Sequence, residues 1–194
     1  MAPSTPARPT ANARVRQTVG DMGRSLGLVF VFIAVLLFVS PARSLVLPGH
    51  GHKVQTVSYS DEVRAATRLT AGAVLEPVGL PHGWQPTSAR VGGGNGDPMT
   101  LHIGYVTPAG EYAALEESDG PAAGFLRGLL GKAGARTVDG TVTVGSAAWQ
   151  VRHDAKGELA LTRTAGGLTL VVTGSAKQAE LESLAGALRP APKQ

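Results

Sequence analysis

The sequence predicts an α+β protein: an N-terminal transmembrane helix, then one domain of two β-β-β-α halves whose antiparallel sheet carries helices on one face. Two observations lead to this prediction. A segment near the N-terminus is long, apolar and uncharged, and from Trp84 onward three extended runs and a helical run occur twice in the same order. Trp84 and Trp149 lie early in each half, which indicates an internal pseudo-repeat. A sheet with one face covered by helices is a stable two-layer arrangement.

The apolar segment predicts a membrane span. Between Arg24 and Arg43 lie eighteen residues without charge, residues 25–42. A helix of that length measures roughly 27 Å, close to the ~30 Å thickness of the hydrocarbon layer. Residues 26–39 are apolar all round, which argues against a surface helix of a small domain. A signal peptide cleaved after Ala42 stays open as the alternative, because residues 40–42 fit a small-x-small cleavage site.

The flanks of this segment predict its orientation. Residues 1–24 form a basic arm rich in Pro, Ala and Thr, which we expect to be disordered. More basic residues precede the span than closely follow it, so the positive-inside rule places the arm in the cytoplasm and the rest of the chain outside. The expected location is therefore the cell membrane, with the lipid bilayer as a partner. Residues 43–58 read as a tether, 59–190 as the extracytoplasmic domain and 191–194 as a tail.

Charge and composition exclude two classes of site. The net charge of +4 belongs entirely to the first 44 residues, where five arginines stand against one aspartate. The remainder holds 13 basic and 13 acidic side chains. A neutral domain offers no electrostatic footprint for phosphate backbones, so no nucleic-acid partner is expected. The chain has no cysteine, which excludes disulfides, thiolate metal sites and a thiol nucleophile.

The first half of the domain is preceded by a predicted short helix with Ser60 as its cap and Val63, Ala66 and Leu69 at helical spacing. Extended runs follow at residues 84–91, 99–106 and 111–117. A glycine-rich loop at residues 92–98 separates the first two, and residues 107–110 fit a turn. A helix near residues 121–130 closes this half and is expected to bury four apolar side chains, Phe125, Leu126, Leu129 and Leu130.

The second half repeats this order. Its extended runs are residues 141–153, 158–164 and 168–174, and Gly166 and Gly167 are expected to form the last hairpin turn. In the closing helix Ser175 and Gln178 fit a capping box, and Pro190 is expected to end the helix. Its apolar residues recur at i, i+3, i+4 and i+7: Leu181, Leu184, Ala185 and Leu188.

Several of these segments also resemble those of a known family. They are "RQTVGDMGRSL" before the span, "GLPHGW" at 79–84, "TSARV" at 87–91, "LHIGYVTPAGEYAALEES" at 101–118 and "VVTGSA" at 171–176. The chain resembles, from about residue 16 to 188, an actinobacterial family of single-pass membrane proteins with an extracytoplasmic domain of unknown function. The resemblance implies a membrane location and a shared domain, and it implies no catalytic residues.

No motif assigns catalytic, cofactor-binding or metal-binding residues. The nucleophile motifs G-x-S-x-G and S-x-x-K are absent. His50 and His52 lie in the tether without a third ligand nearby. Three further histidines are scattered along the domain: His82, His102 and His153. A site that folding assembles from them stays open.

Two further stretches have a chemical and a plain interpretation. The glycines at residues 92–96 are followed by Asp97-Pro98 and a strand, so they predict a hairpin loop rather than a phosphate-binding loop. Three acidic residues, Glu116, Glu117 and Asp119, could pair as acid and base or bind a cation. A solvated strand end is the plainer expectation for them.

The absence of a catalytic motif in an outward-facing domain predicts a binding or scaffolding module of the cell envelope, and no catalysis is expected. Its partner would be an envelope or membrane protein bound at a sheet edge, at the 92–98 loop or in an apolar groove. The candidate partner surface comprises Trp84, Gly93, Asn95 and Trp149, although both tryptophans also fit a core. Two alternatives remain open: an envelope hydrolase with an Asp/Glu/His site assembled by the fold, and a single-span sensor.

Overall fold

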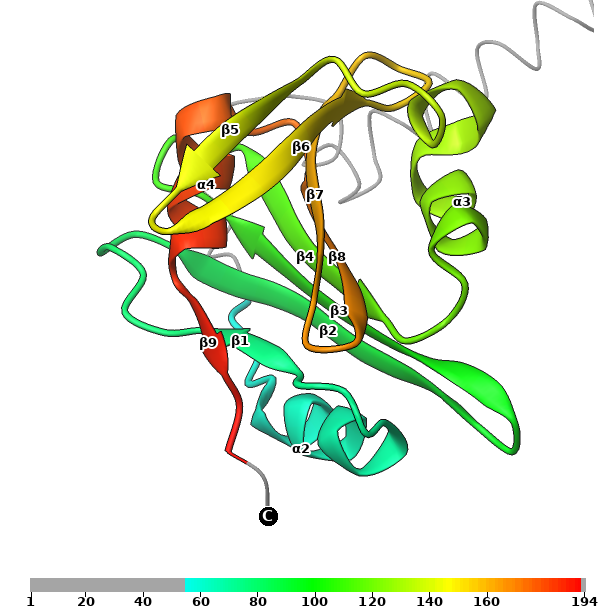
Figure 1. Cartoon of the computed structure of the whole chain (residues 1–194). Coiled ribbons are helices and arrows are strands. Elements are labelled where there is room, and N and C mark those ends of the chain that lie inside the picture. The colour runs from blue at the N-terminus through cyan, green and yellow to red at the C-terminus, as the bar shows by residue number, and fades with distance from the viewer. Residues whose placement is uncertain (1–54, 193–194) are drawn as a thin grey trace, which may run out of the picture. The chain divides into compact units, whose positions relative to one another are not determined.

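Seven antiparallel strands organise the part of the chain that the structure, a computed structural model, describes: residues 55–192 (Figure 1). The strand order is β2-β3-β4-β8-β7-β6-β5. The strands are β2 (Gln85–Gly94), β3 (Asp97–Val106), β4 (Tyr112–Ser118), β5 (Gly140–Val144), β6 (Ala147–His153), β7 (Leu159–Ala165) and β8 (Leu168–Thr173). Each half is a meander, and the two halves meet through their last strands, β4 and β8. The predicted α+β class and antiparallel sheet are thus confirmed for these residues, whereas the basic arm and the predicted span lie outside them.

The second half contains four strands, so the predicted β-β-β-α order is wrong there. The run at residues 141–153 divides into β5 and β6, which pair in register with Val144 opposite Ala147. Gly145 has a positive φ of 61° and forms the two-residue turn with Ser146. The apolar positions shift by one at this turn, from Val142 and Val144 to Trp149 and Val151, and Gly-Ser is a common two-residue hairpin connection. The predicted single run did not take this shift into account.

The β2–β3 hairpin is longer than predicted, and its loop is shorter. Both strands extend into the glycine-rich stretch, and only Asn95 and Gly96 form the turn, with φ values of 54° and 96°. Two left-handed residues of the type Asn-Gly are the preferred connection in a tight hairpin. Gly93 lies within β2 at a register shift between Gly92 and Gly94. The predicted loop at residues 92–98 is therefore mostly strand.

One face of the sheet carries the main core. It is covered by α2 (Ser60–Leu69), by α4 (Gln178–Gly186) and by a small ribbon of β1 (Leu75–Pro77) and β9 (Leu188–Pro190). The largest fully buried side chains of this core include Leu101, Ile103, Tyr105, Leu115, Trp149, Leu161, Leu170, Leu181 and Leu184. Alternate residues of each strand supply these side chains. Leu101, Ile103 and Tyr105 lie on one face of their strand, as predicted.

The helix α3 (Ala122–Gly134) packs on the opposite face, so the prediction of helices on one face is wrong (Figure 1). Its buried Leu126 and Leu130 contact Ala160 of β7 and Val171 of β8. The next residue of each strand, Leu161 and Val172, points into the main core instead. Because α2, α4 and the β1–β9 ribbon already fill the main core face, α3 covers a small apolar patch on the other face.

The predicted helix limits need three corrections. The residue before α2 is Tyr59, and Ser60 is already helical. Ser175 does not cap α4: its hydroxyl donates to Glu111 Oε2 at 2.7 Å and accepts from the Tyr112 amide at 3.1 Å. Pro190 lies in β9, because the chain leaves α4 at Gly186 and returns to pair with β1. Within residues 55–192, no helix combines the length and apolar content that a membrane crossing requires.

Candidate functional site

The sheet face under α3 is polar outside the patch that holds the helix. Cross-strand rows on this face include Arg90, His102 and Glu116 on one side of α3 and Thr141, Gln150 and Thr162 on the other. A cavity of about 430 Å³ lies on the first side, between this face and Phe125 and Leu129 of α3. A second cavity of about 460 Å³ lies on the other side. The helix α3 therefore lies between two cavities on the same polar face of the sheet.

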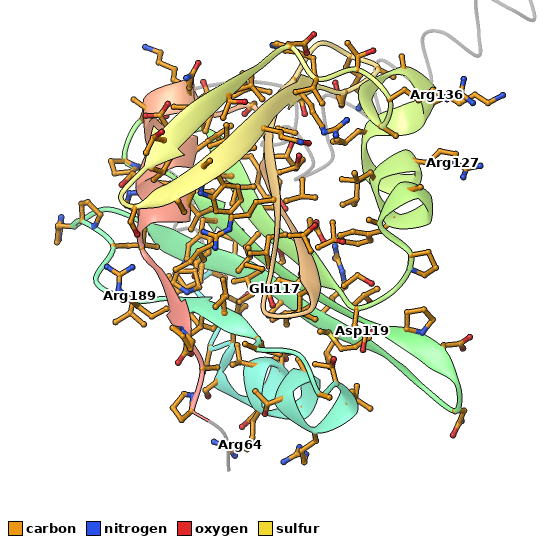
Figure 2. All side chains as sticks on the ribbon, viewed as in Figure 1. Arg64, Glu117, Asp119, Arg127, Arg136 and Arg189 are labelled. Atoms are coloured by element: carbon orange, nitrogen blue, oxygen red, sulfur yellow. The ribbon has the colours of Figure 1, made fainter. Side chains whose placement is uncertain are left out.

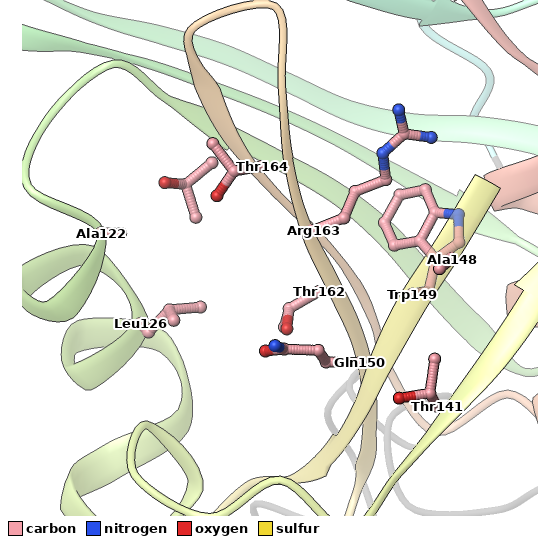
Figure 3. A pocket seen from close by; sticks show the side chains of 10 residues that line it. Ala122, Leu126, Thr141, Ala148, Trp149, Gln150, Thr162, Arg163 and Thr164 are labelled. Atoms are coloured by element: carbon pink, nitrogen blue, oxygen red, sulfur yellow. The ribbon is translucent and has the colours of Figure 1, made fainter.

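Figure 3 shows the larger cavity, where hydroxyl and amide side chains share the lining with apolar ones and with Arg163. Leu126 of α3 faces Thr162 and Gln150 of the sheet across it. At its far end lies Thr141 of β5, the last strand of the sheet. The cavity therefore runs from α3 to an edge of the sheet.

Beside the smaller cavity, three neighbouring strands bring together a serine, a histidine and a glutamate. Ser88 Oγ of β2 lies 2.9 Å from His102 Nε2 of β3, and His102 Nδ1 lies 2.6 Å from Glu116 Oε1 of β4. The side chains of His102 and Glu116 are only 11% and 17% exposed. Because a carboxylate can only accept, Nδ1 carries the proton of the neutral imidazole, and Nε2 accepts the proton of the serine hydroxyl. The order of groups is hydroxyl, imidazole, carboxylate.

A tyrosine and a glycine complete this cluster. Tyr112 OH lies 3.4 Å from His102 Nε2, and its pKa is raised because burial disfavours the phenolate. Gly104, opposite Ser88 in the register, leaves the room that both hydroxyls occupy. A Cβ at residue 104 would collide with Ser88 Oγ and lie 2.6 Å from Tyr112 OH. The missing side chain of Gly104 therefore lets the two hydroxyls approach one imidazole.

The predicted solvated strand end is wrong for Glu117, which is buried, and for Glu116, which is partly buried, whereas Asp119 is exposed. Glu116 and Glu117 point to opposite faces of β4, Glu116 to His102 and Glu117 into the main core. Glu117 is fully buried, and burial raises the pKa of its carboxyl to about 8. Both its oxygens accept from the Leu75 amide of β1, at 3.2 and 3.3 Å, which partly offsets that rise. Asp119 Oδ1 accepts from the Met99 amide at 2.8 Å.

A buried arginine fixes the C-terminal end of α3. Arg152 of β6 is 7% exposed, and its Nη1 donates to three backbone carbonyls, those of Gly134, Ala135 and Thr137, at 2.9–3.2 Å. Its Nε and Nη2 donate to Thr162 Oγ1 and Gln150 Oε1. The last carbonyls of a helix lack partners within the helix, and a cation favours that end of the dipole. Arg152 thus anchors the helix that borders both cavities.

The four residues of the predicted partner surface are not brought together. Trp149 is 1% exposed and lies in the main core, with the Arg163 guanidinium 5.4 Å from the centre of its ring. Trp84 is half-buried and packs edge-on against Tyr105. Gly93 and Asn95 are exposed at the tip of the β2–β3 hairpin. A surface contact through Trp149 is incompatible with this burial, and whether the other three contact a partner stays a prediction.

The sequence could have indicated part of the hydroxyl, imidazole and carboxylate cluster. His102 alternates with Leu101 and Ile103, so it belongs on the face away from the core. The register that places it between Ser88 and Glu116 depends on the bulges of β2, which the glycine-rich stretch leaves undetermined. No group of three His, Asp or Glu side chains among residues 55–192 fits a metal ion. His50 and His52 lie outside the described residues.

The two edges of the sheet differ in chemistry. The edge strand β2 carries Pro86, Arg90 and two register shifts, and the Val57 amide donates to Pro86 O at 2.9 Å. The other edge strand, β5, has the sequence "GTVTV", with no charge and no proline. Proteins protect open edges with charges, prolines and bulges. Within the described part of the chain, β5 pairs with β6 alone along its length.

Comparisons with known proteins identify a family, and the function of that family is unknown. One solved structure, of MucB in complex with MucA(peri), aligns with 78% of this chain at 16% identity and a TM-score of 0.34. The alignment covers 43% of the MucB chain, so this chain spans less than half of that protein. No curated protein matches. The family described as "Protein of unknown function (DUF4245)" matches residues 14–188, nearly the whole sequence. The chain therefore belongs to this family.

Proposed function

We propose that the chain is a membrane-anchored binding module of the cell envelope, whose domain binds an extended segment of a partner protein along β5. The β5 edge carries this proposal, because it is uncharged and has no strand on its outer side among residues 55–192. An added strand would gain main-chain hydrogen bonds from the edge and side-chain pockets from the cavity beside it. Residues 25–42 would anchor the module, with the domain on the outer side of the membrane.

The register of β5 supplies donors and acceptors for such a strand. Val144 and Ala147 flank a two-residue turn, so they form a hydrogen-bonded pair, and Val142 forms the next one with Trp149. Thr141 and Thr143 alternate with these residues, so their N–H and C=O groups point away from β6. An antiparallel or parallel segment could bond these groups without displacing any contact within the sheet.

The neighbouring cavity supports selectivity for the bound segment. Thr141 lines the cavity of about 460 Å³ from the edge side, and Gln150 and Thr162 continue its floor. Alternate side chains of an added strand would lie on the same face as Thr141 and Thr143. Half of its ten lining residues, four threonines and one glutamine, carry a hydroxyl or an amide, which favours hydrogen-bonding side chains in the segment.

Replacing Thr143 by proline is expected to abolish partner binding and leave the fold intact. Proline removes an N–H that points to the open edge, and prolines are tolerated at such edge positions. A photoreactive amino acid at Thr141 should crosslink to a second polypeptide in intact cells. Thr143→Pro should eliminate that product, whereas Thr143→Val, which keeps the amide, should retain it.

The same photoreactive residue at Ala109, an exposed position in the β3–β4 turn, is the matched control and should give no product. Three results would each refute partner binding along β5. They are equal crosslinking from residues 141 and 109, no product from residue 141, and a product that Thr143→Pro does not affect. A crosslink to residues 1–54 of the same chain would also refute it, since the edge would then be closed internally.

The proposed anchor is tested by extraction and labelling. A chain anchored by residues 25–42 should stay with membranes in alkaline carbonate, because a span of that length buries its apolar side chains in the hydrocarbon layer. A tag after Gln194 should react in intact cells with reagents that do not cross the membrane. Release of the full-length chain into the carbonate supernatant would exclude an uncleaved anchor, and a protected tag would exclude the outward orientation.

A further inference from the structure

We propose that Ser88, His102 and Glu116 form a nucleophile, base and orienting acid that hydrolyse a carboxylic ester bound beside α3. This activity goes beyond partner binding at β5 and is independent of it. The geometry carries the inference: Ser88 Oγ to His102 Nε2 is 2.9 Å, and His102 Nδ1 to Glu116 Oε1 is 2.6 Å. Such a chain of contacts activates a serine hydroxyl on unrelated folds, and it is recognised by geometry rather than by a motif.

The hydrogen-bond donors and acceptors of the three groups are arranged as this chemistry requires. Glu116 accepts a hydrogen bond from Nδ1–H of His102, which leaves the lone pair of Nε2 directed at the hydroxyl of Ser88. The strand register fixes the three Cα positions, since Arg90, His102 and Glu116 form one cross-strand row and Ser88 precedes Arg90 by two residues on β2. A site built on strands holds such geometry better than one built on loops.

A neutral donor lies where negative charge would develop. Tyr112 OH is 3.4 Å from His102 Nε2, on the side of the imidazole that faces Ser88. Burial raises the pKa of this phenol, so it keeps its proton and can donate to an oxyanion. Arg90, two residues from Ser88 on the same face, adds positive charge at the cavity.

The cavity defines the class of ester. Its volume of about 430 Å³ lies within the range of small-molecule sites, and Phe125 and Leu129 form an apolar wall opposite the polar strands. His102 and Glu116 line this cavity, whereas Ser88 is not part of its lining and lies two residues from the lining Arg90 on β2. An acyl group of a few carbons fits against that wall. Arg90 at the other wall favours an alcohol part that carries an anionic group.

The reaction conserves atoms and charge. Ser88 Oγ bonds to the ester carbonyl carbon while its proton moves to His102 Nε2, and the oxyanion forms beside Tyr112. The bond from that carbon to the alcohol oxygen then breaks, and His102 returns the proton to the leaving alkoxide. Water repeats the sequence on the acyl-Ser88 ester, with His102 again taking and returning one proton, and releases the carboxylic acid.

The absence of cysteine allows a direct test of this activation. Ser88→Cys creates the single thiol of the chain, next to the imidazole. Its alkylation by iodoacetamide at pH 7 should be at least tenfold faster than that of Ser146→Cys, a single thiol in an exposed turn without a histidine. His102→Gln in the Ser88→Cys background should remove the acceleration. Equal or slower alkylation at residue 88, or acceleration that survives His102→Gln, would overturn the proposal.

The natural serine is tested on the full chain in detergent. A fluorophosphonate should label Ser88, as mapped by peptide mass, and p-nitrophenyl butyrate should be hydrolysed. Ser88→Ala should remove the label and lower hydrolysis at least 100-fold, whereas Ser118→Ala should change neither. Labelling at other serines alone, or hydrolysis that persists in Ser88→Ala, would refute the site. Crosslinking at Thr141 should be unchanged by Ser88→Ala, which separates a failure here from a failure of the β5 edge.

Discussion

Raising the pH from 5 to 9 should destabilise the domain through the single carboxyl of Glu117. This group is fully buried on the core face, and its pKa rises from an ordinary value of 4.5 to about 8 because burial disfavours the charged form. In the folded chain Glu117 therefore keeps its proton up to about pH 8, whereas in the unfolded chain it loses the proton above pH 4.5. The stabilisation is complete below pH 4.5 and is lost as the pH rises to 8.

The loss amounts to roughly 4–5 kcal/mol, from ~1.4 kcal/mol per unit of pKa difference. Urea unfolding of the wild type and of Glu117→Gln between pH 5 and 9 measures it. The glutamine keeps an acceptor for the Leu75 amide and cannot ionise, so Glu117→Gln should lack this part of the pH dependence and exceed the wild type in stability at pH 9. Parallel curves for the two proteins would show that Glu117 ionises freely in the folded state.

Replacing Arg152 by methionine should cost about 3–5 kcal/mol of unfolding free energy. The arginine donates to two buried acceptors, the Gly134 carbonyl and the Thr162 hydroxyl, and methionine leaves both without that donor. It also removes the contacts to the less buried carbonyls of Ala135 and Thr137. Each unsatisfied buried polar group costs roughly 1–3 kcal/mol. Hydrogen exchange should also become faster in the last turn of α3, because Arg152 is what ties that turn to β6.

The matched control is Arg127→Met on the outer side of the same helix, where Arg127 is exposed and points away from the sheet (Figure 2). Surface substitutions of this kind usually change stability by less than about 0.5 kcal/mol. If Arg152→Met and Arg127→Met cost the same in urea unfolding, the carbonyl contacts of Arg152 contribute nothing to the fold.

Most of the strands could be predicted from the sequence, because their apolar residues alternate and one face is buried. Leu101, Ile103 and Tyr105 illustrate this, since all three lie in the core. The β5–β6 turn could also have been predicted, because the apolar positions shift by one across Gly145 and Ser146. The opposite placement of α3 could not, because its Leu126 and Leu130 would fit either face. The helix α3 packs on the other face because α2, α4 and the β1–β9 ribbon already cover the core face.

The candidate site was less predictable than the fold. Ser88, His102 and Glu116 lie on three strands, and each alone is an ordinary polar residue of a solvated face. Their approach depends on the irregular register of β2 between Pro86 and Ser88 and on the missing side chain of Gly104. Spacing along a chain does not encode such cross-strand contacts. The hydrolase alternative, which required a site assembled by folding, is the one that this cluster favours.

The pairing of β1 with β9 has a consequence for how the protein is made. Leu75 is paired in the register with Pro190, so β1 cannot complete its pairing until residues 188–190 have been made. Contacts between such distant positions close late, since the loop entropy must be overcome first. Until β9 emerges, the groups of β1 and the core side of β4 stay exposed, and a nascent chain in that condition is a substrate for chaperones.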